Sequence, residues 1–211
     1  GMKGEKAPGP LHYKPLRNAI HMAVEDLYAA TVYLLEHAAE LHIEPTLFVI
    51  SGSSAGAITV LQADYMKQNN HLLAKKLPEP FRYAGVISFA GGIFSNEGLP
   101  SYKTPPAPTL FFHGTADRLV PYNKAGLFHL GMYGSSQLVK RFRERHYPFI
   151  FYSIEDVGHE VSEYPMQEYL PDIEKFIKEM VFDRRQWMTE IRHKDLLRQS
   201  DNSSTPASYY N

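Results

Sequence analysis

The pattern G-x-S-x-G at residues 52–56 constrains the fold more than any other part of the sequence, because of the segments on either side of it. The apolar, β-rich stretch 46–50 precedes it and predicts a buried strand, and residues 57–63 can continue as a helix. A strand, this pattern and a helix together indicate a nucleophile elbow, a turn so tight that its central serine takes up strained backbone angles. We therefore expect Ser54 to stand between a sheet and a helix.

The residues around Ser54 fit this interpretation. Gly52 and Gly56 lack side chains, and we expect that a side chain at either position would clash with the neighbouring strand or helix. Ser54 would lie at a helix N-terminus, where free N–H groups favour developing negative charge. Two simpler readings stay open: Ser54 could be an ordinary helix N-cap, and Ser53 is a structural neighbour.

Two later segments each join a buried strand to a polar loop. Residues 108–121 carry Asp117 just past a strand, and residues 149–160 present His159 after a glycine. Ser54, Asp117 and His159 thus follow strands in the order nucleophile, acid, base, at the sheet edge where function collects in open α/β folds.

Each of these side chains also has a structural alternative. Asp117 could start a turn before Arg118, and His159 could be a surface loop histidine. The carboxylates of Glu155 and Asp156 are alternative acids, although they lie in the same strand-to-loop segment as His159. His113 ends a strand, where we expect it to bond backbone groups.

The chain resembles the α/β-hydrolase superfamily, most closely its bacterial carboxylesterase and feruloyl- or acetyl-esterase-like branch. The resemblance lies in residues 24–30, 52–56, 113–117 and 158–160, and it covers the chain from about residue 18 to 181. It implies an α/β fold, a three-layer sandwich with a parallel sheet. It also implies a serine hydrolase that cleaves carboxylic esters through an acyl-enzyme intermediate.

The resemblance implies a role for each residue as well. Ser54 would be the nucleophile, His159 the general base and Asp117 the acid that orients it. The backbone N–H of Ala55 would be one donor of the oxyanion hole. Neither a cofactor nor a metal is expected, since no His/Asp/Glu set has metal-ligand spacing.

The sequence departs from the family ahead of the nucleophile. The family places several strands and an oxyanion loop of the His-Gly-Gly type there, whereas here the nucleophile is residue 54. We expect an N-terminally truncated α/β-hydrolase fold. The chain is then a truncated protein, the product of a gene with a misplaced start, or a reduced member of the family. Gly1 before Met2 also reads as a tag-cleavage scar. The alternative function is a catalytically impaired or fragmentary module that retains the triad.

Composition restricts the partners. The formal net charge of −1 implies no broad attraction to nucleic acid or to anionic membranes, and no apolar run is long enough for a transmembrane helix. The expected partner is a small-molecule or carbohydrate-linked ester. The default location is cytoplasmic, or periplasmic if an upstream signal is missing. Zero cysteines exclude a disulfide framework and a thiol nucleophile.

Strands alternating with helices predict one domain over residues 18–198, with an irregular lead at 1–17 and a flexible tail at 199–211. Four strands are readable, and helical propensity continues after residue 180 through Trp187 and Ile191. The elbow strand would lie at a bare sheet edge, which predicts a homo-oligomer or an N-terminal segment folded over that edge.

Three further elements are expected from local signals. Asn18 can cap the first helix. Residues 57–76 are expected to continue the elbow helix, and residues 93–107, which contain three prolines, to form a loop.

Aromatic residues near the predicted strand ends are candidates for an acyl pocket. They would favour an apolar or aromatic acyl group, although such residues more often belong to a core. The candidates are Phe94, Tyr122, Phe128 and Tyr133.

Overall fold

In the computed structural model, which describes residues 13–198 and 205, the main sheet is parallel throughout. Within those residues it has five strands in the order β1-β2-β4-β7-β8. Their bounds are Val49–Ser53 (β1), Gly85–Phe89 (β2), Thr109–Gly114 (β4), Phe149–Ile154 (β7) and Met188–His193 (β8). Every residue of β2, β4 and β7 is buried, as expected for parallel strands covered on both faces.

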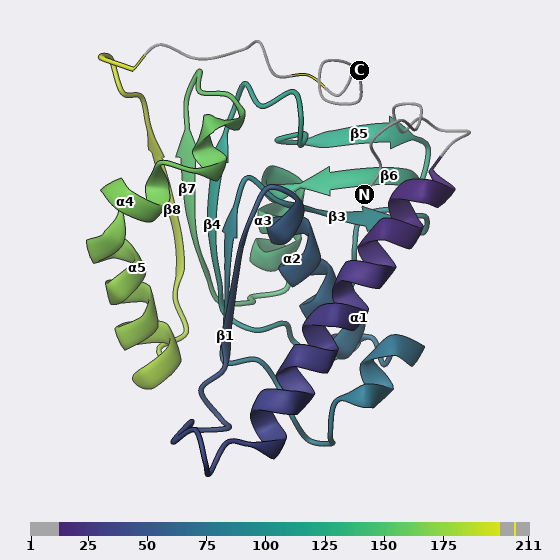
Figure 1. Cartoon of the computed structure of the whole chain (residues 1–211). Helices are drawn as coiled ribbons and strands as arrows, with labels where there is room; N and C mark the ends of the chain where they lie inside the picture. Colours follow the sequence, from purple (N-terminus) through teal and green to yellow (C-terminus); the bar gives the residue numbers. More distant parts are fainter. Residues whose placement is uncertain (1–12, 199–204, 206–211) are drawn as a thin grey trace.

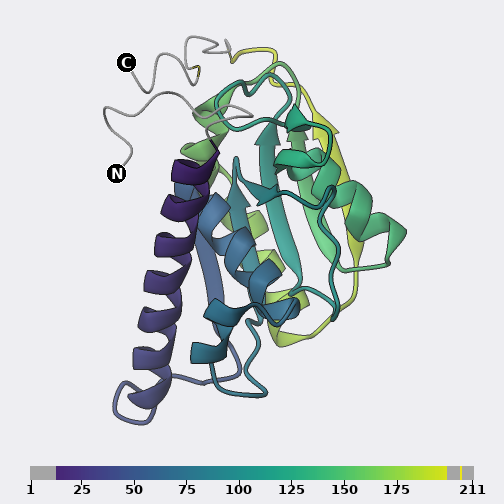
Figure 2. The ribbon, with the colours of Figure 1, turned by 90° about the vertical axis from the view of Figure 1, so that its right-hand side faces the viewer.

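Helices cover both faces of this sheet (Figure 1). Three lie on one face: α1 (Lys14–Glu36), α2 (Ala55–Gln68) and α3 (Ser135–Glu144). The other face carries α4 (Pro165–Glu168) and α5 (Leu170–Phe176), which continues as the π-helical turn Ile177–Phe182. Figure 2 shows α1–α3 in front of the strands. Each face has its own hydrophobic core, so the predicted three-layer α/β sandwich is confirmed.

Helix α1 begins earlier than the sequence predicts. It starts at Lys14, with Pro15 in its first turn, and not at the expected cap Asn18, so residues 14–17 are helical. Proline is well suited to the first helical turn because its ring fixes a helical φ and it needs no backbone donor. The remainder of the predicted lead, and the predicted tail apart from Thr205, lie outside the described residues.

The face of α1 that packs inward is anchored to α2. Tyr28 is fully buried, and its hydroxyl donates a hydrogen bond of 2.6 Å to the carbonyl of Ala63. The helix predicted over 57–76 is interrupted: α2 ends at Gln68, Asn70 has a positive φ of 57°, and the 3₁₀ turn Leu72–Lys76 follows. A residue with positive φ cannot continue a right-handed helix.

A second, smaller sheet was not expected. Its strands are β3 (Gly92–Ser95), β6 (Leu130–Gly134) and β5 (Lys124–Leu127), and they pair antiparallel in that order. The sequence predicted a loop over 93–107, but the first part of it is β3. In Figure 1 this sheet lies beside the N-terminal end of α1.

The segment after α5 also differs from the prediction. Trp187 and Ile191 were expected to prolong a helix, but residues Met188–His193 form β8, parallel to β7. The pairing begins where the N–H of Phe149 donates to the carbonyl of Trp187 (2.8 Å), and Ile191 packs against the adjacent core. Pairing with β7 and the partial burial of alternate residues therefore outweigh the helical propensity of this segment.

Strand β1 lies at the sheet edge, with no strand beyond it in the described part of the chain. An edge strand offers unpaired backbone groups to another chain, and the side chain of Ser51 on this strand is exposed. We therefore keep self-association through β1 as a prediction.

Ser51→Lys tests it, because an added charge on an edge strand opposes pairing with a second copy. We expect wild-type protein to be a dimer or larger by light scattering at micromolar concentration, and Ser51→Lys to shift the mass toward the monomer. Ser51→Ala is the control and should stay associated. A monomeric wild-type protein would contradict the prediction.

Candidate active site

Ser54 occupies the tight turn between β1 and α2. Its backbone angles, φ 53° and ψ −115°, lie in a region that residues with side chains rarely adopt. The N–H of Ser54 donates to the carbonyl of Phe89 at the end of β2, which holds the turn against the sheet (2.9 Å). Ser54 occupies the N-cap position of α2, where its carbonyl accepts the N–H of Ile58 (3.0 Å), but its side chain makes no capping bond to the helix in the described structure.

The two glycines of the elbow serve different purposes. A Cβ on Gly52 would lie 2.3 Å from the carbonyl carbon and oxygen of Gly56, so residue 52 must be glycine for the turn to close. A Cβ on Gly56 would meet no atom within 4 Å. The expectation that both positions exclude a side chain is therefore wrong for Gly56. The backbone of Gly56 lies close to Gly52, and this backbone leaves no room for a side chain at residue 52.

Asp117 fulfils both roles that the sequence left open. Its Oδ1 accepts the N–H groups of Leu119 (2.9 Å) and Val120 (3.0 Å), which makes it the start of a turn. Its Oδ2 accepts a hydrogen bond from Nδ1 of His159 (2.8 Å). The turn fixes the carboxylate, and the fixed carboxylate can orient the imidazole.

The loops that carry Asp117 and His159 are bonded to each other. The N–H of Ala116 donates to the carbonyl of Val157, and the N–H of Asp156 donates to the hydroxyl of Thr115, each at 2.9 Å. A Cβ on Gly114 would lie 2.2 Å from the carbonyl oxygen of Val157, so glycine after His113 lets the two loops meet.

A further bond ties the His159 segment to the elbow strand. His159 opens the 3₁₀ turn His159–Ser162, and the hydroxyl of Ser53 donates to the carbonyl of Ser162 (2.6 Å). Ser53 is thus a structural neighbour, as predicted. Its particular role was not visible in sequence, because the two serines are 109 residues apart.

The three predicted residues form a continuous relay. Nε2 of His159 lies 2.8 Å from Oγ of Ser54, and Nδ1 of His159 lies 2.8 Å from Oδ2 of Asp117. The carboxylate can only accept, so Nδ1 carries the proton and Nε2 is free to accept the serine proton. The Asp117 side chain is 0% exposed and that of His159 is 12% exposed, so the relay is shielded but reachable.

Burial and hydrogen bonding act in opposite directions on Asp117. Burial raises the pKa of this carboxyl group. Hydrogen bonds from His113 and His159, together with electrostatic attraction to the two imidazoles, lower the pKa by a larger amount. The net effect lowers the pKa of Asp117 from 3.8 to about 2. Asp117 is therefore ionised at the pH at which a histidine base works.

The alternative acids face away from the histidine. The carboxylate of Glu155 pairs with Arg192, and that of Asp156 pairs with Lys194, both at the C-terminal end of β8. The backbone bond of 2.9 Å from Glu155 to His193 holds the same segment along β8. These carboxylates stabilise the loop from the side opposite to Asp117.

Ala55 is the first residue of α2 and is exposed. The first N–H groups of an α-helix have no acceptor within the helix, and the helix dipole adds positive potential there. The Ala55 N–H is therefore available to an oxygen atom placed beside Ser54.

The four predicted pocket residues have different surroundings. Phe94 and Tyr133 are 8% and 4% exposed and belong to the larger core. Tyr122 is half-buried, with its hydroxyl 2.7 Å from that of Ser153. Phe128 is 84% exposed, next to the end of β5. Tyr122 packs against the same core as Phe94 and Tyr133, whereas Phe128 is exposed, and the acyl pocket stays a prediction.

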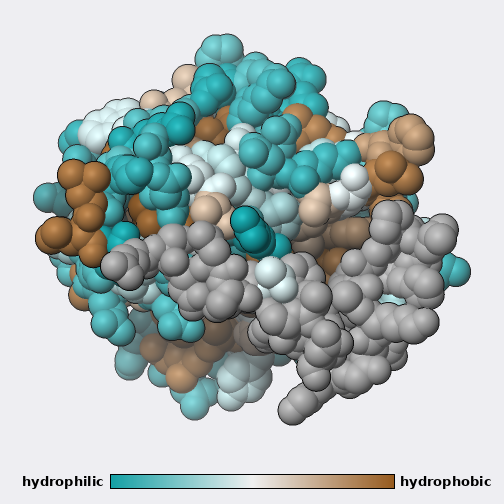
Figure 3. Space-filling model, turned by 90° about the horizontal axis from the view of Figure 1, so that it is seen from above, coloured by the Kyte–Doolittle hydropathy of each residue, from teal (hydrophilic) through white to brown (hydrophobic). Residues whose placement is uncertain are grey.

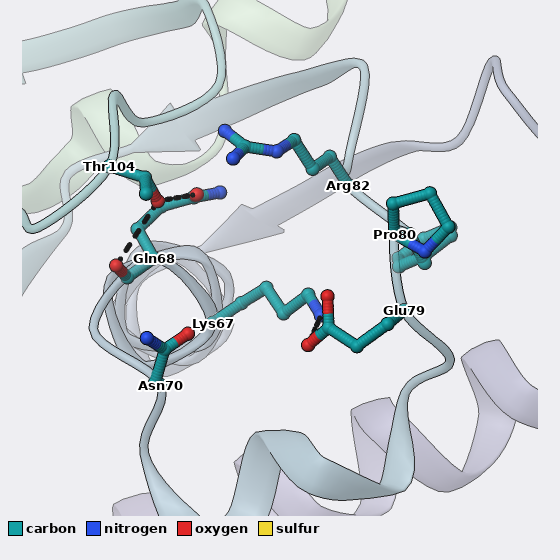
Figure 4. A pocket seen from close by; sticks show the side chains of 8 residues that line it. Lys67, Gln68, Asn70, Glu79, Pro80, Arg82 and Thr104 are labelled. Carbon is teal, nitrogen blue, oxygen red and sulfur yellow. Dashed lines mark hydrogen bonds and ion pairs between the residues drawn. The ribbon is translucent and has the colours of Figure 1, made fainter.

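A polar hollow of about 200 Å³ lies at the far end of α2 (Figure 4). Lys67 pairs there with Glu79 (3.3 Å), and the hydroxyl of Thr104 donates to the backbone and side-chain oxygens of Gln68. At 1.5 Å per residue, α2 places this hollow about 20 Å from Ser54. Its polar groups largely bond one another, and the triad is the better candidate for chemistry.

Seen from above, the end of the molecule toward which the strands point is mostly hydrophilic, with separate hydrophobic patches near its margins (Figure 3). In residues 13–198 and 205, no group of three or more His, Asp or Glu residues is placed to hold a metal ion. No helix in the described segments has the length and apolar character needed to cross a membrane.

The sequence was also compared with known proteins. No protein-family model matches it, and the search of curated proteins gave no match. The function is therefore inferred from the geometry of the site and from the resemblance of its motifs.

The two elbow glycines give a matched pair of substitutions. We expect Gly52→Ala to lower the free energy of unfolding by about 3 kcal/mol, because the new methyl group overlaps the Gly56 backbone. Gly56→Ala should be neutral or raise it by roughly 0.5 kcal/mol, since its Cβ enters open space in a helical turn. Urea unfolding measures both. Equal destabilisation by the two variants would contradict this interpretation.

Asp117 makes stability depend on pH in an acidic window. Its folded pKa is below the unfolded value, so its contribution is complete above about pH 4 and is lost as the pH falls toward 2. The difference in free energy of unfolding between wild type and Asp117→Asn should narrow by about 2 kcal/mol between about pH 5 and pH 2. Urea titrations at several pH values measure it, and a constant difference would refute the assignment.

Proposed function

We propose that the protein is a serine hydrolase that cleaves carboxylic esters through an acyl-enzyme intermediate. The observation that carries the proposal is the relay from Oγ of Ser54 through His159 to Oδ2 of Asp117, with both contacts at 2.8 Å. A serine hydroxyl is a weak nucleophile at neutral pH and needs an adjacent base of this kind. The strained backbone of Ser54 is a second support, since such strain collects at functional sites.

The proposed acylation step uses each atom of the relay. Oγ of Ser54 attacks the carbonyl carbon of the ester while its proton passes to Nε2 of His159. The N–H of Ala55 stabilises the oxyanion that forms. The tetrahedral intermediate then expels the alcohol, which takes the proton from Nε2 and leaves an ester between Ser54 and the acyl group.

Water completes the cycle by the same route. His159 takes a proton from a water molecule, and the hydroxide attacks the acyl carbon. Collapse of the second tetrahedral intermediate releases the carboxylic acid and returns the proton to Oγ of Ser54. Asp117 remains ionised throughout. It holds the imidazole with Nδ1 protonated and stabilises the positive charge that His159 carries between steps.

The proposed substrates are small or carbohydrate-linked esters, and this assignment rests on the resemblance of the motifs to the esterase branch. Each proposed step uses only side chains and backbone groups of the chain, together with the ester and water.

Hydrolysis of p-nitrophenyl acetate tests the proposal. We expect a Ser54-dependent rate, and Ser54→Ala should lower kcat at least ~10³-fold, because the nucleophile is removed and the rest of the site is retained. A fluorophosphonate probe should label wild-type protein, and peptide mapping should place the label on Ser54. The label must not appear on the adjacent Ser53.

Ser51→Ala provides the control, because it removes an exposed hydroxyl from the same strand and should leave the rate unchanged. Folding of each variant is checked by circular dichroism. If folded wild-type protein neither hydrolyses the ester nor takes the label, the proposal fails. The chain would then be the alternative, a hydrolase-like module whose triad does not turn over.

A further inference from the structure

A second histidine contacts the same carboxylate oxygen of Asp117 as His159 does. His113 lies near the end of β4 and is 0% exposed, and it takes no part in the proposed acylation and deacylation steps. Its Nε2 is 3.3 Å from Oδ2 of Asp117 and 3.2 Å from the carbonyl of Val120. Its Nδ1 is 2.8 Å from the hydroxyl of Ser135, the first residue of α3.

These contacts identify the proton on the His113 ring. Both neighbours of Nε2 are acceptors, a carbonyl oxygen and an ionised carboxylate, so Nε2 carries a proton that the two share. In the neutral ring Nδ1 is then an acceptor, and the hydroxyl of Ser135 donates to it. The other neighbour of that hydroxyl, the carbonyl of Gly91, is further away at 3.3 Å.

Two imidazoles therefore converge on one oxygen. Oδ2 of Asp117 accepts from Nδ1 of His159 at 2.8 Å and faces the Nε2–H of His113 at 3.3 Å. We propose that His113 is a positioning residue of the triad, whose Nε2–H holds Oδ2 of Asp117 in line with His159 and limits the charge that this oxygen presents. The inference rests on the proposed hydrolase function.

The geometry explains why this second donor matters. Backbone N–H groups hold Oδ1 of Asp117, so donors surround both oxygens and oppose rotation of the carboxylate. A donor also withdraws charge from the oxygen it contacts. Without the His113 N–H, Oδ2 would stabilise protonated His159 more strongly, and the base would keep its proton to higher pH. The misaligned carboxylate would at the same time slow turnover.

The titratable and polar groups around the rings of His113 and His159 come from three segments. Asp117 and Tyr122 belong to the loop after β4, and the Tyr122 ring meets the His113 ring edge-on at 5.6 Å. Glu160 follows His159 in the 3₁₀ turn, and α3 contributes the hydroxyl of Ser135. Asp117 is the charged group in direct contact with both rings.

Three variants separate positioning from packing. His113→Leu removes the donor, His113→Gln can place an amide N–H near the position of Nε2, and Ser135→Ala removes the partner that keeps Nε2 protonated. Histidine NMR on isotopically labelled full-length protein gives the titration midpoint of His159. The pH profile of p-nitrophenyl acetate hydrolysis gives kcat and KM separately.

We expect His113→Leu to raise the His159 midpoint by about 0.5 pH unit or more and to lower kcat roughly tenfold with little change in KM. Ser135→Ala should move the midpoint in the same direction by less. His113→Gln should return the midpoint toward wild type and recover most of kcat. A purely structural role would lower thermal stability without this pattern.

Phe111→Leu is the matched control, because it perturbs the same strand two residues earlier in the core, without touching Asp117. It should lower Tm and leave the midpoint unchanged. An unchanged or lowered His159 titration midpoint in folded His113→Leu would overturn the proposal. If His113→Leu does not fold, the His159 midpoint of Ser135→Ala decides in the same way. The NMR result is independent of turnover. Absence of hydrolysis and of fluorophosphonate labelling in wild type would refute the hydrolase function alone.

Discussion

The site depends on the hydrogen bonds that the carboxylate of Asp117 accepts. This carboxylate accepts two backbone N–H groups from its own turn on one oxygen and contacts two imidazoles with the other, of which His159 comes from a distant segment. An ionised group with no exposed side-chain surface is costly unless its hydrogen bonds are complete. The same contacts that stabilise this charge therefore also align the base.

The elbow is a second constraint, and it acts through backbone shape. Ser54 can hold its strained angles because its N–H is bonded to the end of β2 and because Gly52 lets the turn close against Gly56. The strain stays local, since α2 continues regularly from Ala55 and packs against β1, β2 and α1. The hydroxyl is thereby presented to His159 from a rigid support.

The sequence predicted those features whose signal lies within one short segment. The apolar run over 149–154 coincides with β7, and the elbow pattern, with its strand and helix, placed Ser54 correctly in the turn between β1 and α2. Partners distant in sequence were not predictable in this way. The strand β8 has helical propensity and becomes a strand only through its pairing with β7, and the contact of His113 with Asp117 depends on how the loop after β4 turns back.

The glycines show the same limit in smaller detail. The pattern G-x-S-x-G has glycine at two positions. Only the folded turn shows that a side chain at residue 52 would clash with the backbone, whereas one at residue 56 would not. The adjacent pair His113 and Gly114 carried a signal of the same kind. A buried strand that ends in histidine and glycine implies close approach of another segment, which here is the loop that carries His159.

The position of β8 has a consequence for synthesis. Translation delivers β7 before β8, so β7, which is followed by the loop that carries His159, is an edge strand of the nascent sheet until about forty more residues are added. That takes a few seconds at typical elongation rates. During that interval its apolar residues and free backbone groups are open to other chains. The charged pairs from Arg192 and Lys194 to the loop after β7 form only when β8 docks, so β8 completes both the described sheet and the support of the loop that carries His159.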